Sequence, residues 1–89
     1  MAWRIEIDTG VQRSMKKLDR QVAKRITAKL REIAQLEDPR SMGKGLTDSM
    51  AGLWRYRVGD YRIICDIEDD VLLVLVVDAA HRSEIYKRR

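Results

Sequence analysis

The stretch "WRYRVGDYR", residues 54–62, predicts a β-hairpin, and this hairpin decides how the chain folds. Gly59-Asp60 is a two-residue loop of the kind that closes hairpins through a primed turn. The cross-strand pairs that follow from such a turn, counted outward, are Val58–Tyr61, Arg57–Arg62, Tyr56–Ile63 and Arg55–Ile64.

The predicted pairing gives the hairpin two faces of different chemistry, because side chains alternate along a strand. One face is aromatic and aliphatic and suits a core: Trp54, Tyr56, Val58, Tyr61, Ile63 and Cys65. The other carries Arg55, Arg57 and Arg62. Like charges directly opposite each other destabilise a sheet, so the Arg57–Arg62 pair indicates an anionic ligand. The alternative is a solvated face on which arginine stems cover apolar surface.

Composition limits the possible architecture and partners. A chain of 89 residues predicts a single domain over residues 1–89 with a modest core. Its net charge of +4 and pI of about 9.5 favour anionic partners. The lone Cys65 indicates a reducing compartment. Neither the N-terminal "MAWRIEID" nor the apolar run Val71–Val77 resembles a signal peptide or a membrane span, so we expect a cytoplasmic protein without membrane contact.

Periodicity predicts the remaining elements. Residues 2–8 alternate as a half-buried strand, with Asp8 or Thr9 capping the following helix. Apolar residues at helical spacing continue to about Leu36, and a break near residues 18–20, with Asp19 as a second cap, divides them into two helices. Residues 38–52 predict a surface loop that Pro39 opens. Residues 71–77 form a continuous apolar run, typical of a strand covered on both faces.

The expected fold class is α+β, with the order β–α–α–β–β–β. Two N-terminal helices should pack on one face of a mostly antiparallel sheet, and the arginine-bearing face should stay open to solvent. The polar tail after the last strand should pack back through Ile85 and Tyr86.

The residue inventory argues against several kinds of chemistry. His81 is the only histidine, and no HxxxH or CxxC spacing occurs, so no metal site is expected. No glycine-rich phosphate loop follows a strand, and no cofactor is expected. Cys65 should be buried and inert.

Cleavage of RNA by its own 2′-hydroxyl fits the residues that remain. Negative charge develops on the phosphorane oxygens, and preorganised arginines stabilise that charge. A base and an acid are also needed. His81 is the candidate whose side-chain type changes charge near neutrality, and Tyr86 could ionise among cations. The alternatives are that His81 is a loop residue and that Tyr86 only packs the tail onto the sheet.

The "LWRYRVGDYRIICDI" hairpin, the apolar strand and the closing "HRSEIY" resemble the RelE/ParE superfamily of bacterial toxins over almost the full chain. The resemblance implies a type II toxin–antitoxin toxin of RelE type, a metal-independent, ribosome-dependent endoribonuclease that cuts mRNA in the ribosomal A site. It also implies a cognate antitoxin, whose complex with the toxin binds operator DNA through the antitoxin. By position, Arg55 and Arg57 match the family's basic residues, Arg62 its phosphate-stabilising arginine, and Tyr86 its C-terminal tyrosine.

Two departures concern proton transfer. RelE itself carries lysines where this chain has Arg55 and Arg57, and an arginine holds its proton too firmly to act easily as a base. RelE also has a basic residue two places before the arginine of the tail motif, where this chain has Ala80, so His81 or Arg82 would take over the acid role.

Basic residues outside the hairpin predict contacts with nucleic acid; they are Arg13, Lys16, Lys17, Arg20, Lys24, Arg25 and Lys44. Two other functions stay open. One is a ParE-like inhibitor of DNA gyrase with the same fold, and the other is a non-catalytic nucleic-acid-binding module.

Overall fold

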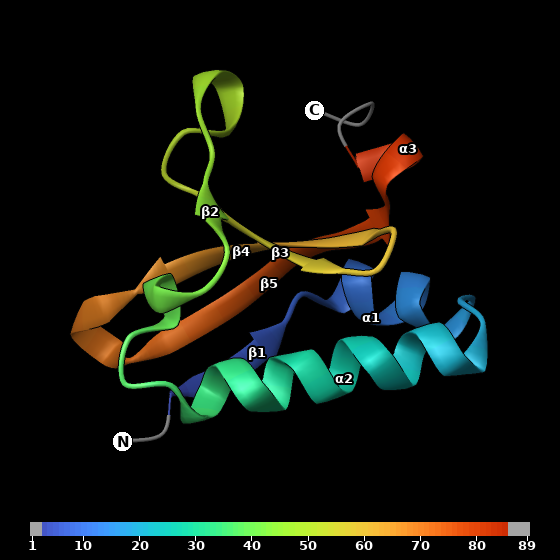
Figure 1. Ribbon diagram of the computed structural model, residues 1–89, viewed down its shortest axis with the longest axis horizontal. Coiled ribbons are helices and arrows are strands. Elements are labelled where there is room, and N and C mark those ends of the chain that lie inside the picture. Colours follow the sequence, from blue (N-terminus) through green and yellow to red (C-terminus); the bar gives the residue numbers. More distant parts are fainter. Residues whose placement is uncertain (1–2, 86–89) are drawn as a thin grey trace.

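The computed structural model describes residues 3–85, which form a five-stranded sheet with two helices on one face (Figure 1). The strands are β1 (Arg4–Ile7), β2 (Lys44–Gly45), β3 (Trp54–Val58), β4 (Tyr61–Glu68) and β5 (Leu73–His81). The α-helices are α1 (Thr9–Lys16), α2 (Arg20–Gln35) and α3 (Arg82–Ile85). Three 3₁₀ turns complete the described elements: η1 (Pro39–Ser41), η2 (Asp48–Met50) and η3 (Asp69–Val71).

The two long helices begin at aspartate caps, as the sequence predicts. The carboxylate of Asp8 accepts the Gly10 N–H at 3.0 Å, and that of Asp19 accepts the Gln21 N–H at the same distance. Each bond satisfies one of the N–H groups that a helix leaves without an internal partner. The chain therefore divides into two helices at the predicted break.

The strand order is β1-β5-β4-β3-β2, with β1 parallel to β5 and every other pair antiparallel. The hairpin register is the predicted one, including Arg57 opposite Arg62. Strand β5 lies between β1 and β4, as its apolar run indicates. The α+β class and the mostly antiparallel sheet are confirmed.

The main core lies between the helices and one face of the sheet, here called the helix face. Ile26, Leu30 and Ile33 of α2 pack there on the apolar side chains of the sheet. The predicted apolar face of the hairpin points into this core; Tyr56 is almost fully buried and Trp54 partly so. The Tyr56 hydroxyl donates to the Pro39 carbonyl at 2.7 Å, which ties β3 to the start of η1.

The opposite face, here called the arginine face, is only partly open, contrary to the sequence prediction. A second cluster covers its centre, where Met50 and Ile85 pack with Ile64 and Ala80. Apolar residues of β4 and β5 on this face need cover, and the segment after β2 and helix α3 supply it (Figure 1).

Residues 38–52 are also more ordered than the predicted surface loop. They contain η1, η2 and the short edge strand β2, and both Pro39 and Met50 are buried. Ile85 packs back onto the sheet as expected. Tyr86, expected to do the same, lies outside the described residues.

Candidate nucleic-acid interface

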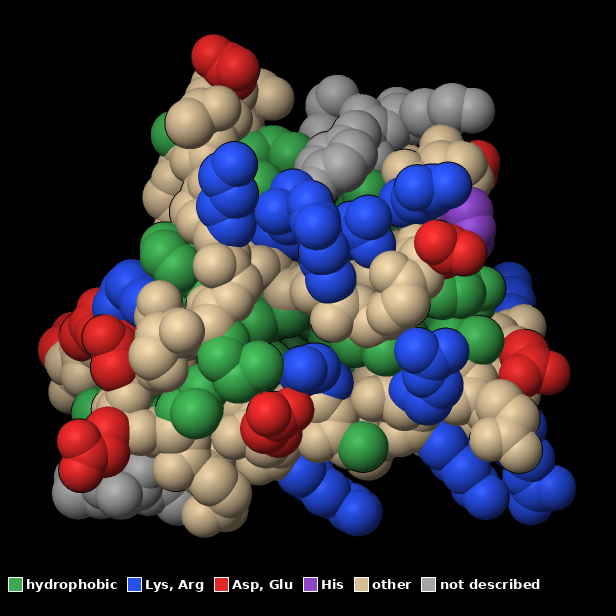
Figure 2. Space-filling view, in the orientation of Figure 1, with side chains coloured by type: hydrophobic (Ala, Val, Ile, Leu, Met, Phe, Trp, Pro, Cys, Tyr) green, Lys and Arg blue, Asp and Glu red, His purple; other side chains and the backbone are tan. Residues whose placement is uncertain are grey.

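Four basic side chains line up across three strands on the arginine face. Arg57 lies opposite Arg62, and Arg55 lies opposite Lys44 of β2. We call Lys44, Arg55, Arg57 and Arg62 the cationic cluster. Strands in a sheet are about 4.8 Å apart, so the cluster spans roughly 10 Å from β4 to β2. Figure 2 shows Lys and Arg side chains gathered on this face between the segment after β2 and helix α3.

The hairpin turn orients Arg62. Its Nη1 donates to the carbonyls of Gly59 at 3.0 Å and Tyr61 at 3.1 Å. In the described residues these bonds engage only Nη1 of the guanidinium. Nε and Nη2 therefore provide the donors that could meet a phosphate oxygen, in the fork geometry that suits phosphate.

Arg55, like Arg62, is held more deeply than the other cations of the cluster. Its side chain is half-buried, and its Nε is shielded from solvent, whereas Lys44 and Arg57 are exposed. A partly desolvated guanidinium interacts more strongly with an anion than a fully hydrated one, because screening by water is weaker. Arg55 is therefore well placed to bind a phosphate group.

The cluster continues around the edge of the sheet onto α2. Strand β2 pairs only with Trp54 and Arg55, so within residues 3–85 the rest of β3 forms the sheet edge there. A hollow of about 410 Å³ at this edge is lined by Lys29, Met42, Gly43, Lys44, Arg55, Tyr56 and Arg57. A neighbouring hollow is lined by Arg25, Ala28, Lys29, Glu32, Arg57, Val58 and Gly59. Lys29 and Arg25 thus extend the cationic surface; Lys29 also pairs with Glu32 at 3.2 Å.

The remaining predicted binding residues lie away from the cluster. Arg13, Lys16, Lys17, Arg20 and Lys24 are exposed on α1, α2 and the segment between them. Those helices cover the helix face, whereas the cluster lies on the arginine face (Figure 1). Of the predicted helical cations, Arg25 comes nearest to the cluster, because its guanidinium lies against Gly59 of the hairpin turn.

The structure does not bring His81 to the cationic cluster. His81 pairs with Tyr61, so its side chain lies on the helix face of the sheet. The two rings meet edge to face with centroids 5.4 Å apart. Its Nδ1 accepts the backbone N–H of Ser83 at 3.1 Å. This bond places the proton of a neutral ring on Nε2.

Arg82 fastens the end of β5 to the hairpin. Its backbone N–H donates to the Asp60 carbonyl at 2.7 Å, and its exposed guanidinium lies 3.9 Å from the Asp60 carboxylate. The role predicted for Tyr86 falls on a residue outside the described part of the chain.

Comparison with known proteins gives the family. The family model described as "ParE toxin of type II toxin-antitoxin system, parDE" matches residues 5–86. The chain belongs to this family of toxins. The curated toxin RelG of Mycobacterium tuberculosis is 31% identical over 91 residues, which cover 99% of this chain and 100% of the relative.

Solved structures of toxins share the fold. The toxin–antitoxin complex RelBE2 of M. tuberculosis matches with a TM-score of 0.83 at 23% identity, over 93% of this chain and 94% of the other. A free mutant of the Escherichia coli toxin RelE matches with a TM-score of 0.76 at 23% identity, over 98% and 93%. At these identities the likeness establishes the fold of this toxin.

A β-bulge places an acidic side chain of the toxin on the arginine face. Cys65 pairs with Val76, but Ile64 pairs with Asp78, so Val77 is an extra residue on β5. The bulge turns Asp78 away from the main core, and the residue is nevertheless only 5% exposed, with Oδ1 accepting the Ala79 N–H at 2.9 Å. Bulges often re-aim side chains beside functional sites. Sequence reasoning missed Asp78, because strict alternation assigns it to the helix face.

The same register places Ala80 opposite Arg62. The departure from the RelE pattern at this position therefore lies directly on the arginine face. Here alanine packs in the second cluster with Ile64 and Ile85 and leaves the space above Arg62 without an additional cation from β5.

Two buried groups of the toxin are unsuited to chemistry. Burial raises the pKa of the Cys65 thiol to about 12, which keeps it protonated and unreactive near neutrality. Burial also raises the pKa of the Tyr56 phenol well above its usual value. Among residues 3–85, no group of three or more His, Cys, Asp or Glu side chains is arranged to hold a metal ion, and no helix is long and apolar enough to cross a membrane.

Proposed function

We propose that this toxin is a ribosome-dependent endoribonuclease that cleaves mRNA in the ribosomal A site without a metal ion. The observation that carries the proposal is the Arg57–Arg62 pair, backed by Arg55 and Lys44 on the same face. A cross-strand pair of cations weakens the sheet that contains it, whereas a bound phosphate turns the same pair into a favourable contact.

In the proposed reaction, the 2′-hydroxyl attacks the neighbouring phosphorus and the 5′-oxygen leaves. Arg62, oriented by the turn carbonyls, and Arg55, partly withdrawn from water, stabilise the charge that builds on the phosphorane oxygens. Arg57 and Lys44 hold the adjacent backbone.

Proton transfer is assigned to the tail motif, with His81, Arg82 and Tyr86 as the candidates. Arg82 is exposed beside the hairpin turn, near the end of the face that carries Arg62. His81 would have to leave Tyr61 and Ser83 to reach a phosphate bound at the cluster.

We also propose that a cognate antitoxin neutralises the toxin in the cytoplasm and that their complex binds operator DNA through the antitoxin. Several structural relatives were solved as toxin–antitoxin complexes, among them RelBE2 of M. tuberculosis. An acidic, amphipathic antitoxin segment would suit the cationic cluster and the apolar residues beside it. Arg13, Lys16, Lys17, Arg20, Lys24 and Arg25 would supply further contacts to nucleic acid.

Primer extension on a translated mRNA, with and without the toxin, tests the proposed activity. We expect cuts within codons that appear only when ribosomes and toxin are both present. Cuts on naked RNA at the same positions would contradict ribosome dependence, and an absence of cuts in both conditions would contradict the nuclease.

Inhibition of DNA gyrase is the second candidate, and the match to the ParE family model favours it. A supercoiling assay with purified gyrase separates the two. Inhibition of supercoiling together with intact mRNA would replace the nuclease with the gyrase inhibitor.

A further inference from the structure

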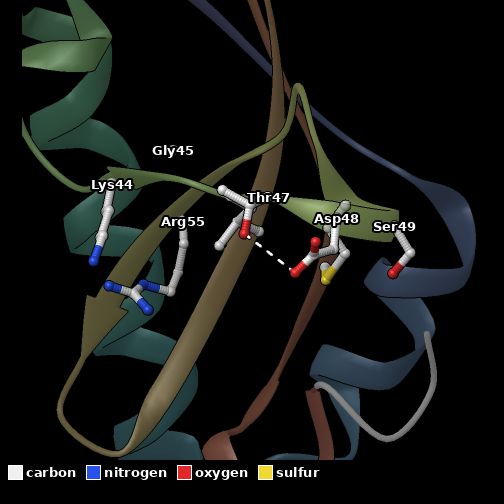
Figure 3. A pocket seen from close by; sticks show the side chains of 8 residues that line it. Lys44, Gly45, Thr47, Asp48, Ser49 and Arg55 are labelled. Atoms are coloured by element: carbon white, nitrogen blue, oxygen red, sulfur yellow. Dashed lines mark hydrogen bonds between the residues drawn. The ribbon is translucent and has the colours of Figure 1, made fainter.

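A hollow beside the cationic cluster is lined by carboxylate and hydroxyl groups as well as by cations, and phosphate binding does not require those oxygens. It lies under the segment that links β2 to β3, residues 46–53, here called the arm (Figure 3). Its volume is about 490 Å³, and its lining is Lys44, Gly45, Leu46, Thr47, Asp48, Ser49, Met50 and Arg55. Lys44 and Arg55 belong to both the hollow and the cluster, so the two sites are continuous.

The hollow is cationic on one side and rich in hydrogen-bonding oxygens on the other. Lys44 and Arg55 reach in from neighbouring strands, and the arm contributes the Asp48 carboxylate with the Thr47 and Ser49 hydroxyls (Figure 3). The Thr47 Oγ1 lies 3.5 Å from Asp48 Oδ2, at the outer limit of a hydrogen bond. A ligand that suits both sides is anionic at one end and carries hydrogen-bond donors at the other, which describes a nucleotide.

The arm holds Asp48 in a defined position. Asp48 has φ 58°, in the left-handed region that few residues other than glycine adopt. Backbone bonds from Met50 N–H to the Thr47 carbonyl (3.2 Å) and from Ala51 N–H to the Asp48 carbonyl (3.1 Å) close the turn around it. The Met50 side chain is buried in the second cluster and anchors the arm to the sheet. Non-glycine residues in the left-handed conformation, such as Asp48, concentrate at ligand-binding turns.

We propose that this hollow is the subsite for one base of the bound RNA, and that Asp48 selects guanine there. The inference rests on the proposed nuclease function and adds its base preference. An ionised carboxylate only accepts hydrogen bonds, through two oxygens side by side. The Watson–Crick edge of guanine presents two donors side by side, N1–H and the N2 amino group, whereas each of the other bases has a single donor group on this edge with an acceptor beside it. Single-stranded RNA exposes this edge to protein side chains.

Arg55 and Lys44 complete the subsite by binding the reacting phosphate and the adjacent backbone on either side of this nucleotide. Thr47 and Ser49 can each donate or accept a hydrogen bond, so they suit guanine O6 or a ribose hydroxyl. The cations of the strands thus bind the phosphate, which every nucleotide carries, and the arm binds the base, which differs between nucleotides.

Asp48→Asn tests the assignment with little disturbance of the backbone. Asparagine has nearly the same shape and tolerates the left-handed conformation, but it replaces one acceptor oxygen with a donor amide. The matched control is Asp70→Asn, the same change on the exposed turn η3 between β4 and β5, away from the arm. The readout is sequencing of cut ends from ribosome-bound mRNAs with a randomised A-site codon.

We expect the wild-type toxin and Asp70→Asn to cut with a guanine preference at one codon position. Asp48→Asn should cut guanine-containing codons more slowly, so that its guanine preference falls roughly 5- to 150-fold, the discrimination carried by one two-point base contact. A wild type without guanine preference, or an Asp48→Asn variant with the wild-type preference, would overturn the assignment.

If the toxin cuts no mRNA, the proposed nuclease function is contradicted, but the guanine subsite can still be tested by a direct binding measurement. The backbone amide signals of residues 47–49 would be followed by NMR during titration with 5′-GMP and with 5′-AMP. A response selective for GMP that disappears in Asp48→Asn supports the subsite. Equal responses to both nucleotides, or no response to either, would overturn it.

Discussion

The two faces of the sheet are built from the same strands but differ in role: the helix face forms the main core, and the arginine face carries the cationic cluster. Thirteen buried residues of the described chain, four of them from α1 and α2, form one continuous core on the helix face. On the arginine face of the described residues, Met50, Ile64, Ala80 and Ile85 form a smaller buried cluster, and the cationic cluster lies beside it. Tyr56 and Arg57 show the contrast within one step of the chain: the first is 1% exposed in the core, and the second is exposed beside Arg62. A domain of this size can therefore devote one face to stability and leave the other for a ligand.

The largest expected effect is on the helix face. Ile63 is fully buried in the main core, so Ile63→Ala should lower the free energy of unfolding by about 2–5 kcal/mol, through lost burial and the cavity left behind. Chemical denaturation measures the change. Val71 is the control, because it is 51% exposed, and Val71→Ala should stay within about 0.5 kcal/mol. Similar losses in both variants would mean that the helix face is not the main source of stability.

The next effect is on the arginine face and concerns rate. Arg62→Ala should lower the single-turnover rate of mRNA cleavage by about 10²–10³, the usual loss for one charge-stabilising donor. Ribosome affinity should change much less, because many other cations share that contact. Arg4→Ala removes the same charge from an exposed site on β1, at the far edge of the sheet, and should cut normally. Equal losses of rate and affinity in Arg62→Ala would make Arg62 a binding contact only.

A smaller loss of stability is expected when the buried Tyr56 hydroxyl is removed. Tyr56→Phe removes the hydrogen bond to the Pro39 carbonyl and should lower stability by about 0.5–1.5 kcal/mol, with cleavage unchanged. Tyr61→Phe, at a half-buried ring, should cost less by the same denaturation measurement. If Tyr56→Phe instead abolished cleavage at unchanged stability, the helix face would contribute to the site.

The smallest effect should have the opposite sign. Arg57→Thr removes the like-charge contact with Arg62 and introduces a residue that favours strands, so the melting temperature should stay the same or rise slightly. Arg62→Thr should gain less, because it also loses the bonds to the Gly59 and Tyr61 carbonyls. A large fall in melting temperature in Arg57→Thr would show that the cationic cluster is structural.

The sequence predicted those parts of the molecule that depend on local patterns. The Gly59-Asp60 turn determines the hairpin register, and with it the placing of Arg55, Arg57 and Arg62 on one face. The aspartate caps and the apolar stripe of α2 are equally local signals.

What the sequence did not predict depends on long-range contacts. Strand β2 has two residues, too few for any periodicity, and it forms because Lys44 and Gly45 meet β3. The second cluster needs Met50, Ile64 and Ile85 together, from three distant segments. His81 was expected among the cations, but its register with Tyr61 takes it to the other face.

The bulge at Val77 affects how this chain can be compared with its relatives. It puts the two halves of β5 out of phase, so that Val76 points to the core before it, and Ala79 after it. A relative that lacks the extra residue would align with this chain only with a one-residue gap inside the strand. Without that gap, every position from Asp78 to the end of β5 would be matched to a residue on the wrong side of the sheet. Residue roles can therefore be transferred across this point only between chains that share the bulge.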